Sequence, residues 1–146
     1  MVSLLELTAT FCAGVFFGAA IYISIAQYPA ALEAGAGVGG RFFPPMYRRD
    51  APMQILLAIV GSLAGLVLWG MGNELLWLVG SLFLVSVIPI TLIAIKPVND
   101  VLLNPKHDPD GSDTEGLLRK WGPRHWWRSI VSRVAFVLFL LARASA

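Results

Sequence analysis

The sequence predicts an all-α fold in which four transmembrane helices form one bundle. The first observation is composition: of 146 residues, 57% are hydrophobic and only 14% are charged, with a mean hydropathy of +0.72. A soluble domain usually carries about 25% charged residues. A chain of this length cannot bury so much apolar surface in water. We therefore expect a single membrane domain that covers residues 1–146.

The second observation is that four apolar stretches each have nearly the length needed to cross a bilayer. About 20 helical residues, rising 1.5 Å each, cover a hydrocarbon layer about 30 Å thick. Helices are expected because an isolated strand would leave its backbone groups unpaired in lipid. The predicted spans cover about residues 4–28, 53–71, 75–95 and 126–142.

The third observation is the distribution of basic residues between the connections. Residues 72–74 predict a tight turn, whereas residues 29–52 and 96–124 predict long loops on one side of the membrane. The two loops hold eight Lys and Arg residues, and the opposite side holds only Arg143. Since basic residues favour the cytoplasmic side, we place both loops in the cytoplasm and both termini outside. The predicted location is the cytoplasmic (inner) membrane, crossed several times.

Small residues and a proline within the spans predict how the helices pack. Gly14 with Gly18, and Gly61 with Gly65, are pairs four residues apart, a spacing that lets helix backbones approach closely in lipid. These pairs serve packing within the bundle or association into a homo-oligomer, and the sequence leaves both open. Pro89 predicts a kink in the third span.

Composition also excludes several classes of site. The net charge is +2, but the basic residues lie between apolar spans, so no nucleic-acid binding is expected. Cys12 is the single cysteine, which excludes an internal disulfide and predicts a small, buried apolar side chain. No haem, flavin, nicotinamide or metal motif is recognisable, so the expected partners are membrane lipid and a lipophilic small molecule.

Polar chemistry is predicted at the start of the fourth span. Pro123 suits the first helical position. Helical spacing then gives one face to a polar set, namely His125, Arg128, Ser129 and Ser132. Arg133 lies beside this face and is expected to point into the bundle toward a partner, for which Asp50, Asp100 and Gln54 are the candidates. A helix N-terminus with two arginines suits a carboxylate, a phenolate or a lipid phosphate.

Other polar and aromatic residues fall on the same predicted side of the membrane. The first loop contributes Tyr47 and Arg48, the end of the third span leads to Asn99, and Trp121 precedes the fourth span. Their convergence suits a pocket roofed by the two loops. The alternative interpretation is that the Trp and Arg residues only anchor helices at the membrane surface.

Four segments carry a family resemblance through their order and spacing. They are residues 14–18 with 28–30, residues 43–49 with 52–54, residues 95–99 with Leu102, and Trp121 followed by His125 and Arg128. This pattern resembles the DUF1772 family, the anthrone-oxygenase-like integral membrane proteins. Some members of that family are linked to the oxidation of anthrones to anthraquinones. The resemblance implies a four-helix membrane bundle and an O₂-dependent oxygenase of a lipophilic phenolic or anthrone-like substrate.

The resemblance also implies roles for individual residues. His125 would be the base that removes a proton from the substrate, and Arg128 and Asn99 would stabilise the resulting anion. Four further residues would bind the substrate or an anion, namely Trp121, Arg133, Tyr47 and Arg48. Such a reaction with O₂ needs no bound cofactor. The chain departs from the family pattern at Gln27, because many members carry an acidic residue near there.

Two other functions stay open from the sequence. One is a non-enzymatic accessory or scaffold protein that binds lipid or a partner subunit. The other is a small transporter, which ranks last because Glu6 lies too near the outer end of the first span. A pocket lined by His125, Arg128 and Asn99 would favour the enzyme, and side chains spread into the lipid headgroups would favour the scaffold.

Overall fold

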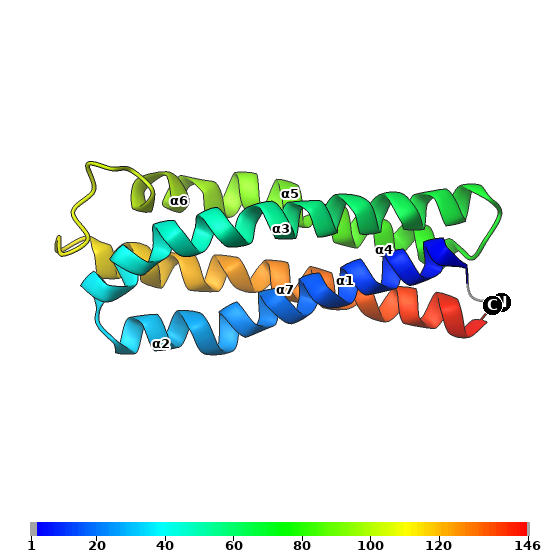
Figure 1. The fold of residues 1–146 in the computed structure, drawn as a ribbon, viewed down its shortest axis with the longest axis horizontal. Helices are drawn as coiled ribbons and strands as arrows, with labels where there is room; N and C mark the ends of the chain where they lie inside the picture. Colours follow the sequence, from blue (N-terminus) through cyan, green and yellow to red (C-terminus); the bar gives the residue numbers. More distant parts are fainter. Residues whose placement is uncertain (1–2, 146) are drawn as a thin grey trace.

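The computed structural model describes residues 3–145, which form four long antiparallel helical rods and contain no strand (Figure 1). The first rod joins α1 (Leu4–Tyr22), the π-helical η1 (Ile23–Gln27) and α2 (Tyr28–Glu33). The second is α3 (Ala36–Gly70), and the fourth is α7 (Thr114–Ser145). The third joins α4 (Leu75–Val85), α5 (Val87–Ile90), the π-helical η2 (Thr91–Ile95) and α6 (Lys96–Leu102). The predicted four-helix bundle is thereby confirmed.

The bundle has the surface of a membrane protein. Three rods, covering residues 4–33, 36–70 and 75–102, are long and apolar enough to cross a bilayer. Large apolar side chains such as Phe11, Leu63 and Ile93 lie exposed along them. The fourth rod, α7, is not among the three, and it carries Arg128 and Arg133 within its apolar part. Its crossing, and the side of the membrane on which the termini lie, stay predictions, although α1 begins and α7 ends at the same end of the bundle (Figure 1).

The long first loop predicted for residues 29–52 is wrong, because this segment is helical. The first rod continues to Glu33 and α3 begins at Ala36, so the two are joined by a tight turn at Gly35, whose φ is 108°. Pro44, Pro45 and Pro52 lie inside α3 without ending it. In a membrane bundle, neighbouring helices and local adjustments satisfy the backbone groups that a proline frees, so these residues are poor markers of a helix end.

The second long loop, predicted for residues 96–124, is also shorter than expected. Residues 96–102 form α6 and α7 already begins at Thr114, so only residues 103–113 are irregular. Pro123 therefore lies well inside α7 rather than at its first position. An ion pair of 2.6 Å between the Arg41 Nη1 and Asp110 Oδ2 atoms ties the irregular segment to the start of α3.

Two of the rods change their winding immediately before a proline. In η1 and η2 the backbone hydrogen bonds reach five residues back, and each segment is followed by one residue and then by Pro29 or Pro97. A proline has no N–H, and its ring crowds the carbonyl four residues earlier, so a wider turn accommodates it. The third rod is also interrupted at Ser86, close to the kink predicted from Pro89.

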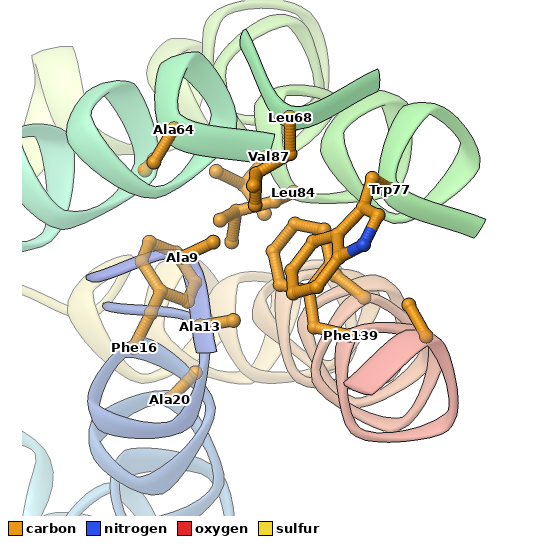
Figure 2. Close-up of a cluster of buried hydrophobic side chains, with 13 residues drawn as sticks. Ala9, Ala13, Phe16, Ala20, Ala64, Leu68, Trp77, Leu84, Val87 and Phe139 are labelled. Carbon is orange, nitrogen blue, oxygen red and sulfur yellow. The ribbon is translucent and has the colours of Figure 1, made fainter. Parts of the chain in front are cut away.

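The larger of two apolar clusters fills the half of the bundle in which α1 begins and α7 ends, and its side chains are drawn in Figure 2. A smaller cluster lies in the other half. Trp77 of α4 stacks on Phe139 of α7, with ring centroids 5.2 Å apart. Both rings are almost fully buried, together with Phe16 and Leu84. Cys12 is buried as predicted.

Glycines let the helices approach this core closely. A Cβ atom at Gly80 would lie 2.6 Å from the Phe139 ring, and one at Gly61 would lie 2.8 Å from both Cys12 and Leu84. Gly65 is similarly closed by Ser81. The Gly61/Gly65 pair therefore packs within the bundle, whereas Gly18 of the other pair faces open space. Association of two copies stays a prediction.

Candidate functional site

The site is built on one buried stripe of α7. Its members follow at intervals of one, three or four residues and are Trp121, His125, Arg128, Ser129 and Ser132, all buried. Residues at these intervals lie on one face of a helix, so the predicted grouping of the last four is confirmed. The stripe faces η1, α3 and α6, and it follows directly on the apolar core.

A buried hydrogen-bond chain connects Arg128 to a carboxylate. The Arg128 Nη2 donates to Gln54 Oε1, and Gln54 Nε2 donates to Asp50 Oδ1 over 2.6 Å. Gln54 is fully buried and Arg128 is only 7% exposed. The guanidinium also lies over the Phe16 ring, 5.3 Å from its centroid, which stabilises a buried cation. A buried charge needs a partner, and here one amide joins Arg128 to its partner Asp50.

A second network surrounds His125. Its Nδ1 lies 3.0 Å from the Ser24 Oγ, which in turn lies 2.9 Å from the Ser129 Oγ. The imidazole stacks on the Trp121 indole, with ring centroids 4.6 Å apart. Its Nε2 is buried and has no hydrogen-bond partner within residues 3–145. Ser24 belongs to η1, so the π-helical turn before Pro29 contributes to the placement of this hydroxyl.

A third set of contacts joins Asn99 of α6 to the Trp121 indole. The Trp121 Nε1 donates to Asn99 Oδ1 over 2.9 Å. The indole also meets Phe43 edge-on, with ring centroids 5.5 Å apart, and Tyr28 at 5.8 Å. Asn99 therefore fixes the indole on which His125 stacks. The η2 turn also contacts α7 near this site, because Arg124 Nη1 donates a hydrogen bond to the Ala94 carbonyl over 3.1 Å.

Two clefts flank α3 at the level of these networks. The larger cleft, of about 510 Å³, lies between the first rod and α3. Its walls are mainly apolar, with Tyr22, Phe42 and Met46 among them, and its polar groups include Arg49 and Asp50.

The smaller cleft, of about 90 Å³, lies between α3 and the α5–η2 segment. Tyr47, Gln54 and Arg128 line it among apolar side chains. Asp50 therefore borders one cleft and Arg128 borders the other, and Gln54 connects them.

The residues predicted for the site divide into three groups. Arg128 and Tyr47 meet at the smaller cleft. His125, Asn99 and Trp121 are buried and line neither of these two clefts. The expected pocket of His125, Arg128 and Asn99 therefore does not form. Two arginines, Arg48 and Arg133, are exposed.

The expectation that Arg133 points into the bundle is wrong. It follows Arg128 by five residues, which places it about 140° around the helix at 3.6 residues per turn. The buried stripe therefore excludes it. Of its expected partners, Asp50 and Gln54 hold Arg128 instead, and Asp100 pairs with Lys96 at 2.6 Å.

Sequence reasoning missed three site residues. Ser24 has no signal except the Pro29 that follows η1. The sequence identifies Gln54 and Asp50 as candidate partners of Arg133, but not as partners of Arg128 or as catalytic candidates. The signal that would have identified Asp50 is its spacing of four residues from Gln54, which gives both side chains one face if the segment is helical. Within the described part of the chain, no three His, Cys, Asp or Glu side chains gather as a metal site.

We expect His125→Ala to lower the free energy of unfolding by about 2–3 kcal/mol, because it leaves a cavity and removes the hydrogen bond to Ser24. His125→Phe retains a ring against Trp121 and is expected to lose less. Denaturation of both variants in mixed micelles measures the difference. Equal stability of His125→Ala and the unmodified protein would contradict the buried network.

No curated protein and no solved structure matches the chain. The family model described as anthrone oxygenase matches residues 43–138, which is well over half of the chain. The matched segment includes Asp50, Gln54, Asn99, His125 and Arg128. This membrane-embedded helical bundle therefore belongs to the anthrone oxygenase family.

Proposed function

We propose that the protein is an O₂-dependent oxygenase that acts on a lipophilic phenolic or anthrone-like substrate bound in the larger cleft. The observation that carries the proposal is this cleft of about 510 Å³, in which a half-buried carboxylate, Asp50, borders mainly apolar walls. Ligand sites usually have volumes of about 300–1,000 Å³ and combine apolar walls with few polar groups. The smaller cleft, of about 90 Å³, has the volume of about three water molecules and is too small for three fused rings.

The chemistry needs a base beside an apolar surface. In an anthrone, the methylene group lies between two aromatic rings, and loss of its proton gives an aromatic anion with charge on the carbonyl oxygen. Asp50 accepts this proton. The anion transfers its electrons to O₂, a C–O bond forms, and protonation gives a hydroperoxide. Loss of water from the hydroperoxide, with the second methylene proton, gives the quinone, so that one oxygen atom enters the product and the other leaves as water.

The cationic groups around Asp50 have separate roles in this proposal. Arg49 borders the same cleft and would stabilise the negative charge that develops on the substrate oxygen. Arg128 acts through Gln54, which orients the Asp50 carboxylate by donating to its Oδ1. The proposed reaction uses no bound cofactor.

The role of His125 changes accordingly. The family resemblance implied that His125 is the base, but this side chain is fully buried and borders neither cleft. We assign His125 to positioning instead. It supports Ser24 of η1 and the Trp121 indole, and η1 forms one wall of the larger cleft through Ile23 and Gln27.

The experiment is O₂ consumption by the purified protein in detergent with a reduced anthrone substrate. Ala19 lines the larger cleft, so Ala19→Phe should fill part of it and reduce uptake strongly. Ala30→Phe is the matched control, because Ala30 is exposed on α2 and is not part of the cleft wall. Absence of uptake by the unmodified protein, or equal uptake by both variants, would overturn the proposal.

A second candidate function is a non-enzymatic membrane scaffold. Trp126 and Trp127 on α7 are exposed, and Arg133 lies exposed on the same helix, as expected of residues that anchor a helix in the headgroup region. A protein with only this role would show no O₂ uptake with any of the anthrone substrates, and filling the cleft would change nothing that the assay measures.

A further inference from the structure

A separate polar site lies away from the clefts described above, in a groove between α1 and α7 near the end of α7. The groove has a volume of about 350 Å³, and both Thr10 and Arg143 line it. Each contributes a buried polar atom that has no hydrogen-bond partner within residues 3–145, namely Thr10 Oγ1 and Arg143 Nε. The remaining wall is apolar and includes Phe11, Val15, Phe136 and Leu140.

The hydroxyl of Thr10 differs from others in the helices of this protein. The Thr8 Oγ1 donates to the Leu4 carbonyl over 2.8 Å, and the Thr91 Oγ1 donates to the Val87 carbonyl over 2.7 Å. Threonine in a helix commonly makes this bond to the preceding turn. Thr10 does not make it, although the residue is only 6% exposed. Burial of an unpaired hydroxyl is unfavourable, so a ligand with a polar acceptor atom fits this position.

We propose that this groove binds one phospholipid, with its phosphate held by Arg143 and Thr10 and an acyl chain along the apolar wall. An Arg guanidinium pairs strongly with phosphate oxygens. Glu6, the acidic residue of the first turn of α1, is engaged in the helix cap, where it accepts a hydrogen bond from the Ser3 backbone. It therefore does not neutralise Arg143. The apolar wall points to a lipid rather than a free phosphate, because an inorganic anion would leave that wall uncovered.

The position of the two polar residues along the bundle agrees with a lipid headgroup. Arg143 lies in the last turn of α7. Thr10 lies about 9 Å along α1 from its start at Leu4, at a rise of 1.5 Å per residue. A phosphate near both residues would therefore lie close to one end of the bundle, where headgroups are expected, and the acyl chain would run toward its middle.

Lipid retention by the purified protein in detergent tests the proposal. Native mass spectrometry after addition of phosphatidylglycerol should show one retained lipid, and Arg143→Gln should weaken its binding about tenfold, as expected for the loss of one charged hydrogen-bond donor. Arg119→Gln is the matched control, because Arg119 is an exposed arginine of α7 that pairs with Glu115 on the surface and is not part of the groove wall. Equal retention by Arg143→Gln and the unmodified protein, or equal losses in both variants, would overturn the proposal.

Two further arms separate the lipid from its headgroup and from a folding defect. Inorganic phosphate and glycerol phosphate should not displace the lipid, and displacement by either would show that the apolar wall is not used. Thr10→Val removes only the unpaired hydroxyl, so without lipid it should be at least as stable as the unmodified protein. It should gain less thermal stability when phosphatidylglycerol is added, and an equal gain would exclude Thr10 from the site.

Discussion

Asp50→Asn is expected to lower the rate of anthrone-dependent O₂ uptake by about 10²–10⁴-fold, the range for loss of a positioned base. The substitution retains the shape of the side chain and an oxygen atom that can accept from Gln54 Nε2. The hydrogen-bond chain to Arg128 can therefore persist while the proton acceptor is lost. Initial rates of O₂ uptake at saturating substrate, with a thermal denaturation curve for each sample, separate loss of chemistry from loss of fold.

Asp100→Asn is the matched control for this prediction. Asp100 is also a helical aspartate, but it is exposed and pairs with Lys96 on the surface of α6. Exposed ion pairs contribute little to stability, and Asp100 does not line the larger cleft. Its replacement should leave the rate of uptake unchanged. If Asp50→Asn retained the full rate, the assignment of Asp50 as the base would be wrong. His125 would then become the stronger hypothesis for the base.

Phe139→Ala is expected to lower the free energy of unfolding by about 3–5 kcal/mol, as for other large-to-small substitutions of a buried aromatic residue. Phe139 is fully buried, stacks on Trp77 and lies against the backbone at Gly80. Helix association in lipid depends on close packing rather than on escape from water. Removal of the ring therefore forfeits its dispersion contacts with α4 and, at Gly65, with α3, and rigid helix backbones cannot close the cavity.

Reversible unfolding in mixed micelles, followed by circular dichroism, measures this loss. Phe83→Ala is the matched control, because Phe83 is 37% exposed on α4 and the same atoms are removed from a site with fewer contacts. It should change the unfolding free energy by less than about 1 kcal/mol. Comparable losses for the two variants would show that the Trp77–Phe139 contact does not dominate the core.

The predicted spans agree with the structure where the chain contacts only lipid and apolar neighbours. Hydropathy alone located the four rods, because each span must contain about 20 apolar residues whatever it packs against. It did not locate their ends. Gly39 and Gly40 resemble loop residues in the sequence, yet in the bundle they lie against Leu118 and Thr114, where a larger side chain would not fit. A glycine needed for close helix packing and a glycine in a loop look identical in a single sequence.

The site was predicted in the same partial way. The spacing of His125, Arg128, Ser129 and Ser132 identified their shared face, since helical periodicity is a local property. Arg133 was assigned wrongly because the number of neighbouring helices, and hence the width of the buried face, is not a local property. Asp50 was missed as a site residue because its segment was predicted as a loop.

The lipid environment, the helical class, the number of rods and the polar face of α7 could be predicted from the sequence, because each depends on composition or on the spacing of nearby residues. Which charge meets which partner could not be predicted in this way. The contacts from Arg128 through Gln54 to Asp50, and from His125 to Ser24, join residues 74 and 101 positions apart in the chain. Such pairings depend on the axial register of packed helices, and that register is set by the fit of glycines and aromatic rings in the core.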